Sequence, residues 1–155
     1  MAATAPLSKY KKQNCIIGIA VLLVLGAWFS YDGYLNDKFI KEHTTVNENG
    51  EKVPDSDLVF NRKSPPFFLA GALLLGGYFF VIKNKKLVAD ENSLVTPKTE
   101  IPYDSIEKID KTYFKKKGYF VVTYKEDGNQ RTAKFSDRTY DNLEAVLDEL
   151  VKKIL

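Results

Sequence analysis

The sequence is poor in the residues that build catalytic and metal centres. It has one cysteine, Cys15, and one histidine, His43, in 155 residues. A single cysteine excludes an intramolecular disulfide and any metal site made of several cysteines. The histidine stands in a polar segment near Asp37 and Glu42, where an isolated imidazole is ordinarily solvated. We therefore expect no metal site and no cofactor.

Catalytic motifs are equally scarce. The one histidine is expected on the other side of a membrane from the carboxy-terminal segment, so no nucleophile–histidine–acid set can be assembled there. The chain has no glycine-rich phosphate-binding loop, because Gly76 and Gly77 lie in an apolar run and Gly118 follows three lysines in an expected turn. We expect a protein that is not an enzyme.

Charge is missing from two long apolar runs, Cys15 to Tyr31 and Pro65 to Ile82. Each run is close to the roughly 17–25 residues that a helix needs to cross about 30 Å of hydrocarbon. The runs predict an integral membrane protein with two spans. Ionisable residues inside a membrane usually mark transport pathways, so their absence argues against a transporter acting alone.

Positive charge collects at one border of each run. The lysines concerned are Lys9, Lys11 and Lys12 ahead of the first run and Lys83, Lys85 and Lys86 behind the second. Lysine and arginine at membrane borders stay preferentially in the cytoplasm, so both termini are expected there. Residues 36–63 have five basic and six acidic side chains, and the chain from Leu87 has twelve and thirteen. This balance gives no basic face for a nucleic-acid partner.

These features divide the chain into five parts. We expect a basic cytoplasmic amino terminus (1–14), a first transmembrane helix (15–35), an external loop (36–64), a second transmembrane helix (65–82) and a cytoplasmic domain (83–155). The alternative for the first run is a cleaved signal peptide. Trp28, Phe29 and Tyr31 stand where cleavage requires small residues, which favours an uncleaved anchor.

Small residues predict how the two helices pack. Gly26 with Ser30, and Ala72 with Gly76, recur at a spacing of four, which lets helix backbones approach closely. The alternative is that small residues are simply common in membrane helices. Cys15 lies at the inner border of the first run, where palmitoylation is chemically possible, but a buried thiol is the simpler interpretation.

The carboxy-terminal segment has the pattern of strands followed by one helix. We expect strands at 86–89, 93–96, 99–102, 107–114, 119–124 and 130–135, separated by turns that include 115–118 and 126–129. From Tyr140, apolar residues recur every three or four positions as far as Ile154, which predicts an amphipathic helix. Thr139 or Asp141 is available as its cap. The predicted fold is an α+β membrane protein with two transmembrane helices, a small antiparallel sheet and a closing helix.

Several features of this segment occur in a fixed order. Paired strands over 86–96 turn near Asp90, the segment Ile101-Pro-Tyr-Asp-Ser-Ile-Glu-Lys-Ile109 follows, and a long strand begins at Tyr119 after a glycine. In this order the segment resembles the bacterial PH-like domains that follow short membrane hairpins. The resemblance implies a bacterial inner or plasma membrane and a curved antiparallel sheet capped by the last helix. A full PH barrel has seven strands, so a membrane segment or a second subunit is expected to close the open edge.

Two functions fit this organisation. The first is a protein-interaction module, a scaffold or accessory subunit, with a protein partner or a second copy of the chain held at a sheet edge or strand–helix groove. The second is recognition of an anionic lipid headgroup by membrane-proximal lysines. The lysines of this second hypothesis are Lys83, Lys85, Lys86, Lys115, Lys116 and Lys117.

Overall fold

The structure is a computed structural model and describes residues 2–154. About half of the chain is helix and 28% is strand, in two long apolar helices, small antiparallel sheets and a carboxy-terminal helix. The expected α+β class is therefore confirmed. The chain divides into two compact units, Met1–Gln13 with Phe80–Leu155, and Asn14–Phe79.

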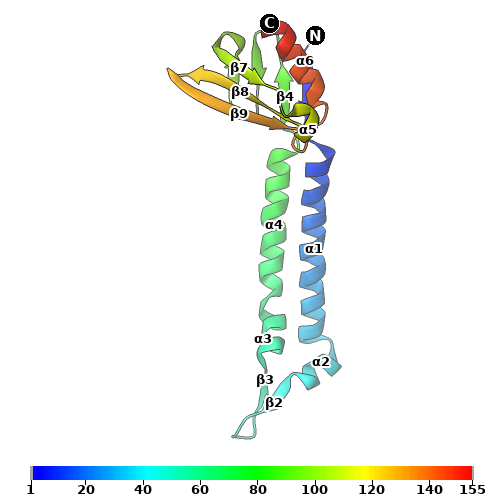
Figure 1. The fold of residues 1–155 in the computed structure, drawn as a ribbon. Coiled ribbons are helices and arrows are strands. Elements are labelled where there is room, and N and C mark those ends of the chain that lie inside the picture. The colour runs from blue at the N-terminus through cyan, green and yellow to red at the C-terminus, as the bar shows by residue number, and fades with distance from the viewer. Residues whose placement is uncertain (1, 155) are drawn as a thin grey trace. The chain divides into compact units, whose positions relative to one another are not determined.

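The second unit is built on two long helices that run side by side (Figure 1). These are α1 (Lys9–Tyr34) and α4 (Pro65–Ile82), which α3 (Ser56–Lys63) precedes. Both α1 and the helical stretch Ser56–Ile82 are long and apolar enough to cross a membrane. Between them lie α2 (Asp37–Glu42) and an antiparallel hairpin of β2 (Thr44–Val46) and β3 (Lys52–Pro54).

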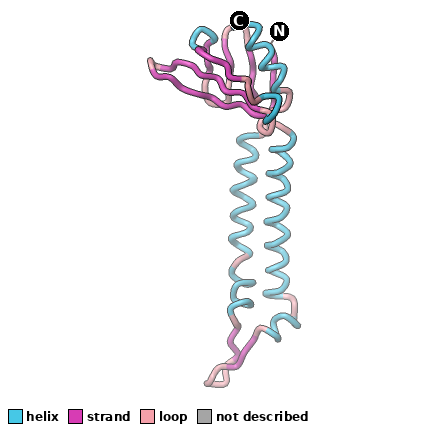
Figure 2. Tube along the Cα trace, viewed as in Figure 1, coloured by secondary structure: helices cyan, strands magenta, loops and turns pink. Residues whose placement is uncertain are grey.

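The first unit contains two antiparallel sheets and the last helix (Figure 2). Within residues 2–154, one sheet has the order β1-β4-β5-β6 and the other has the order β7-β8-β9. The strands are β1 (Ala3–Pro6), β4 (Lys86–Ala89), β5 (Ser93–Val95), β6 (Glu100–Pro102), β7 (Ile106–Asp110), β8 (Tyr119–Glu126) and β9 (Asn129–Ser136). The closing helix is α6 (Leu143–Ile154).

The core of this unit lies between the sheets and one face of α6. Phe120 and Val122 of β8 are fully buried, as are Leu87, Leu94 and Ile101 of the first sheet. Helix α6 contributes Leu143, Val146, Leu147 and Leu150, all buried, at the three- and four-residue spacing that the sequence displays. The expected strand boundaries from Lys86 onward agree with the structure to within a few residues, apart from 107–114.

An amino-terminal strand is the main addition to the expected fold. Strand β1 pairs with β4 in antiparallel register, with Ala5 opposite Leu87. Ala5 and Leu87 are completely buried. The segment that the sequence presents as a basic tail therefore begins as an edge strand of the first sheet.

Helix α1 begins earlier than its apolar run because Ser8 caps it. The Oγ atom of Ser8 accepts the N–H of Lys11 at 3.1 Å and donates to the carbonyl of Arg138 at 2.6 Å. The Ser8 N–H donates to the carbonyl of Thr139 at 2.9 Å. Asp141, expected to cap α6, instead accepts the N–H of Lys9 at 3.0 Å. The loop before α6 thus holds the start of α1.

Two expected elements differ locally. The pattern of residues 107–114 predicts one strand, but β7 ends at Asp110. The lysines expected in a turn form a single helical turn, α5 (Phe114–Lys117), closed by Gly118 at φ 66°. A left-handed glycine after the last helical residue is a common way to end a helix. The sequence Lys-Lys-Lys-Gly is therefore compatible with the observed helical turn as well as with the expected turn.

The buried face of β1 gives the first testable prediction. Ala5→Asp places an unpaired carboxylate at a completely buried position, so we expect the free energy of unfolding of the full chain to fall by about 3 kcal/mol or more. Thr4→Asp is the matched control, because Thr4 is exposed on the opposite face of the same strand. Denaturant unfolding in detergent measures both, and equal stabilities would contradict the packing of β1.

Candidate functional site

We call the unit that contains the two sheets, Met1–Gln13 with Phe80–Leu155, the strand domain. The two lysine clusters of the lipid hypothesis lie at one end of it. Lys115, Lys116 and Lys117 are exposed on α5, whereas Lys83, Lys85 and Lys86 span the stretch from α4 into β4. A series of backbone hydrogen bonds joins the two regions. We call these six lysines the basic end.

This series runs through the loop before α6. The carbonyl of Gly118 accepts the N–H of Asp137, the carbonyl of Thr139 accepts the N–H of Ser8, and the carbonyl of Lys85 accepts the N–H of Leu7. The three distances are 2.8, 2.9 and 3.0 Å. Both clusters are thus fixed to the end of the domain where α1 begins and α4 finishes.

Aromatic rings orient some of these ammonium groups. The Nζ atom of Lys83 lies 4.1 Å from the centre of the Phe80 ring, and that of Lys117 lies 4.9 Å from the Tyr113 ring. Both distances are within the roughly 6 Å range of cation–π attraction. Lys117 is exposed and Lys83 is partly exposed.

The residues predicted to pack the helices lie in different environments. Gly26 faces α4, where a Cβ atom would meet the Phe68 side chain at 3.4 Å, and Ala72 is buried. Ser30 donates to the carbonyl of Gly26 within its own helix, at 2.8 Å. Gly76 faces open space. The Cys15 thiol is buried, which favours the structural interpretation over palmitoylation.

The closest backbone approach to a glycine in the unit Asn14–Phe79 is one that no sequence pattern predicts. A Cβ atom on Gly33 would lie 3.0 Å from the backbone carbon of Asn61, and the Gly33 carbonyl accepts the Nε–H of Arg62 at 2.9 Å. The only signal in the sequence is a glycine near the end of an apolar run, which does not identify its neighbour.

A shallow groove separates β7 from α6. The apolar side chains that line it are Ile106 and Ile109 from the strand and Val151 and Ile154 from the helix. Its volume is about 140 Å³, well below the 300 Å³ or more of typical small-molecule pockets. The groove therefore suits a single side chain of a larger partner better than a free ligand. We call it the strand–helix groove.

Strand β7 is an edge of its sheet, because within the described residues it pairs with β8 alone. Its register shifts between Ile106 and Lys108, as in the bulges that edge strands often contain. The sequence displays the four apolar residues of the groove, but they meet only through the packing of α6, which no local pattern predicts.

The charges beside the groove are unevenly compensated. Lys125 and Gln130 hold the Glu107 carboxylate at 2.9 and 2.6 Å, and these contacts lower the pKa of Glu107. Lys108 and Lys111 also line the groove. Glu107 is therefore already paired with side chains of its own sheet. Lys108 and Lys111 at the rim of the groove favour acidic groups on a partner.

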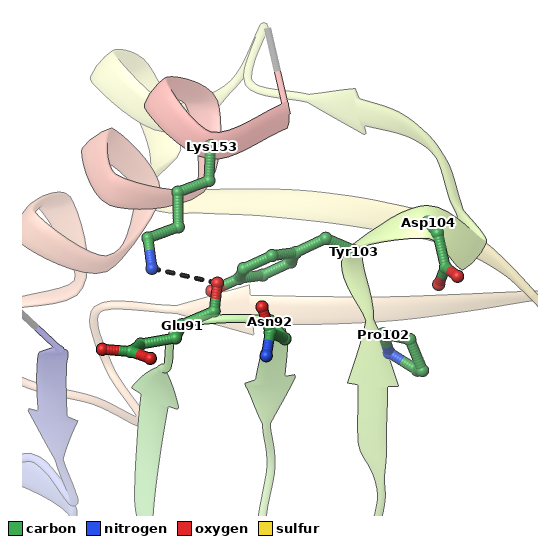
Figure 3. A pocket seen from close by; sticks show the side chains of 6 residues that line it. All are labelled: Glu91, Asn92, Pro102, Tyr103, Asp104 and Lys153. Atoms are coloured by element: carbon green, nitrogen blue, oxygen red, sulfur yellow. Dashed lines mark hydrogen bonds between the residues drawn. The ribbon is translucent and has the colours of Figure 1, made fainter.

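A second, open hollow of about 550 Å³ lies beside Tyr103. Figure 3 shows Lys153 reaching from α6 toward Tyr103 and the turn between β4 and β5. The Lys153 Nζ atom donates to the carbonyls of Asp90 and Glu91 at 2.8 and 3.2 Å, and the Tyr103 hydroxyl donates to that of Asp90 at 2.7 Å. These polar groups stabilise the turn, so we assign them a structural role.

Comparison of the chain with protein-family models, with curated proteins and with solved structures finds no match. The geometry described above therefore carries the functional argument.

Tyr103 gives a prediction of pH dependence. Burial, and then the nearby Asp90 and Glu149, raise the pKa of Tyr103 to about 12, against about 10 in an unfolded chain. The folded state therefore keeps a proton that the unfolded state loses. This contribution to stability is complete below pH 10 and disappears as the pH rises toward 12.

We therefore expect a smaller alkaline loss of stability in Tyr103→Phe than in the parent protein. The variant should also be less stable by about 1 kcal/mol at neutral pH, because it lacks the hydrogen bond to Asp90. Urea unfolding at several pH values measures both effects, with Tyr10→Phe as a control at an exposed tyrosine. The same alkaline slope in all three proteins would overturn the assignment.

Proposed function

We propose that this chain is a non-enzymatic integral membrane protein with a cytoplasmic PH-like domain that serves as a protein-interaction module. Such a module suits a scaffold or an accessory subunit of an assembly. The strand–helix groove carries the proposal, because it combines an edge strand with an apolar hollow of side-chain size.

The strand count supports a PH-like domain. Within residues 2–154 the domain unit has seven strands in two antiparallel sheets, with α6 packed on the core. Seven is the number in a full PH barrel. The strand that the carboxy-terminal segment lacks comes from the amino terminus of the same chain, so neither a membrane segment nor a second subunit is needed to supply it.

The pairing of β1 with β4 supports the proposed orientation. Both ends of the helical hairpin join one sheet, which favours an arrangement in which the two membrane-length helices leave and return on the same side of a bilayer. The lysines at both borders favour the cytoplasm as that side. The stretch Leu25-Gly26-Ala27 is the best, though poor, cleavage site that the first run offers to a signal peptidase. Cleavage there would remove β1 and Ser8 from the domain, which further favours an uncleaved anchor.

The groove indicates what kind of partner segment would bind. An extended segment can add to the free edge of β7 through main-chain hydrogen bonds, with alternate side chains directed toward pockets. The lining of isoleucine and valine favours an aliphatic side chain in the hollow, and Lys108 and Lys111 favour acidic neighbours. We propose an extended protein segment of this composition as the ligand.

Photo-crosslinking in native membranes tests the interaction proposal. With benzoylphenylalanine in place of Lys108, beside the groove, we expect a discrete adduct larger than the monomer. The same group in place of Lys98, an exposed residue in the turn before β6, should give no such adduct. Adding Lys111→Glu should weaken the adduct by removing an attractive charge. Monomer alone from both positions, or identical adducts from both, would count against the proposal.

Anionic-lipid recognition is a second candidate, favoured by the geometry of the basic end. The backbone hydrogen bonds described above fix α5 and the start of β4 at the same end of the domain. If that end meets the cytoplasmic leaflet, each lysine contributes roughly 1 kcal/mol of attraction to an anionic surface. A test requires the full chain, because a fragment that begins at Lys83 lacks β1.

Hydrogen exchange of the full chain in nanodiscs tests this candidate. We expect slower amide exchange over residues 113–118 with phosphatidylserine than with phosphatidylcholine alone, and loss of the difference at high salt. Combined Lys115→Glu, Lys116→Glu and Lys117→Glu should abolish it, whereas Lys98→Glu should not. Exchange that does not depend on lipid charge would exclude lipid recognition by α5.

A further inference from the structure

The hairpin between the two long helices brings together three side chains that the sequence does not associate. His43 follows α2, whereas Asp55 and Asp57 lie at the start of α3. The His43 Nδ1 atom lies 2.7 Å from Oδ2 of Asp55 and 3.9 Å from Oδ2 of Asp57. All three donor atoms lie within 4.8 Å of one another.

Backbone structure positions two of these donors. The Asp55 N–H donates to the His43 carbonyl at 2.9 Å, which extends the β2–β3 pairing by one step. The imidazole also packs on the Phe39 ring, with 4.1 Å between ring centres. The imidazole and the first carboxylate are therefore placed by the fold of the hairpin and not by their mutual attraction alone.

The start of α3 leaves one oxygen of Asp55 directed at the cluster. Its Oδ1 atom accepts the N–H groups of Asp57 and Leu58 at 3.1 and 3.0 Å. Oδ1 is thus used as a helix cap, and Oδ2 faces His43.

The cluster carries negative charge that the rest of the chain does not neutralise. Within residues 2–154, the His43 ring is the nearby basic side chain for both Asp55 and Asp57, and neither carboxylate forms a salt bridge with a lysine or arginine. Two carboxylates whose oxygens lie within 4.8 Å of each other repel each other. A divalent cation would offset this repulsion.

The donor set identifies the class of cation. Imidazole nitrogen with carboxylate oxygens suits zinc and neighbouring first-row divalent metals, whereas calcium and magnesium prefer oxygen alone. Zinc binds such donors at about 2.0–2.2 Å, so two donors on one tetrahedral zinc are roughly 3.4 Å apart. The observed separations of 2.7 and 3.9 Å lie on either side of this value.

We infer that His43, Asp55 and Asp57 form a binding site for a zinc-class divalent cation, at the β2–β3 hairpin in the segment between the two long helices. The three donors leave at least one coordination position for water or for a group from a partner. The site is independent of the strand–helix groove and of the basic end. The single histidine of the chain thus lies with Asp55 and Asp57, and not with Asp37 and Glu42, the acidic residues near it in the sequence.

Calorimetric titration of zinc chloride into the full chain, purified in detergent without a histidine tag, tests the inference. We expect one zinc per chain. His43→Asn retains an amide that can still donate to Asp55, and Asp55→Asn retains a residue that caps helices well. Each should weaken zinc binding by more than about tenfold, and Asp57→Asn should weaken it in the same direction.

Matched controls separate coordination from general electrostatics. Asp37→Asn and Glu42→Gln remove one charge each near His43 without removing a donor atom, so zinc affinity should change by less than about threefold. The proton-decoupled carbon resonances of the His43 ring provide a second readout, since they should shift on addition of zinc in the parent protein and in both controls, and shift less in Asp55→Asn at the same zinc concentration. Zinc affinity that is unaffected by His43→Asn, or equally reduced by the controls, would overturn the inference, as would the absence of binding.

Discussion

The pairing of β1 with β4, together with the Ser8 contacts that follow it, is the constraint on which this structure depends. It holds the chain immediately before α1 beside the chain immediately after α4, with 3.0 Å between the Leu7 nitrogen and the Lys85 oxygen. The long helices are therefore an insertion between two adjacent strands of one sheet. The same contacts complete that sheet and fix the residues of the basic end.

An insertion of this length has an energetic consequence. Bringing together two ends separated by a long flexible segment costs conformational entropy that grows with the logarithm of its length. Here the segment is not flexible, because α1 and α4 contact each other through Gly26 and Gly71. The paired helices bring the two ends of this segment close together before β1 meets β4. The burial of Ala5 and Leu7 therefore has to offset a smaller loss of conformational entropy. Helix packing and sheet completion therefore reinforce each other.

Local patterns predicted the parts of the fold whose causes are local. Alternating aromatic and β-branched residues indicate β8, and the spacing from Leu143 to Leu150 indicates α6. No local pattern predicts strand β1, because Ala-Thr-Ala-Pro has little strand propensity and its partner strand is far away in the sequence. The sequence offers Asp141 as a cap for the helix that follows it, but the Asp141 carboxylate accepts the N–H of Lys9, which is distant in the sequence.

The candidate sites were the least predictable features, because each depends on contacts between distant segments. The lysines of the basic end were identified from composition, but their common location follows from the bonds of Ser8 and Asp137. The strand–helix groove exists only where β7 and α6 meet. For His43, the acidic residues nearest in sequence are not those that the β2–β3 hairpin brings to its imidazole.

The two long helices themselves offer little chemistry. Their apolar stretches have no ionisable side chain in the interior, and their close contacts involve glycine, alanine and aliphatic groups. Polar groups that can bind a partner, a lipid or a metal are therefore confined to the segments beyond the helix ends. In the proposed orientation those segments lie in two different aqueous compartments. A protein of this design is suited to present separate surfaces on the two sides of a membrane, and its function is to be sought in what binds each surface.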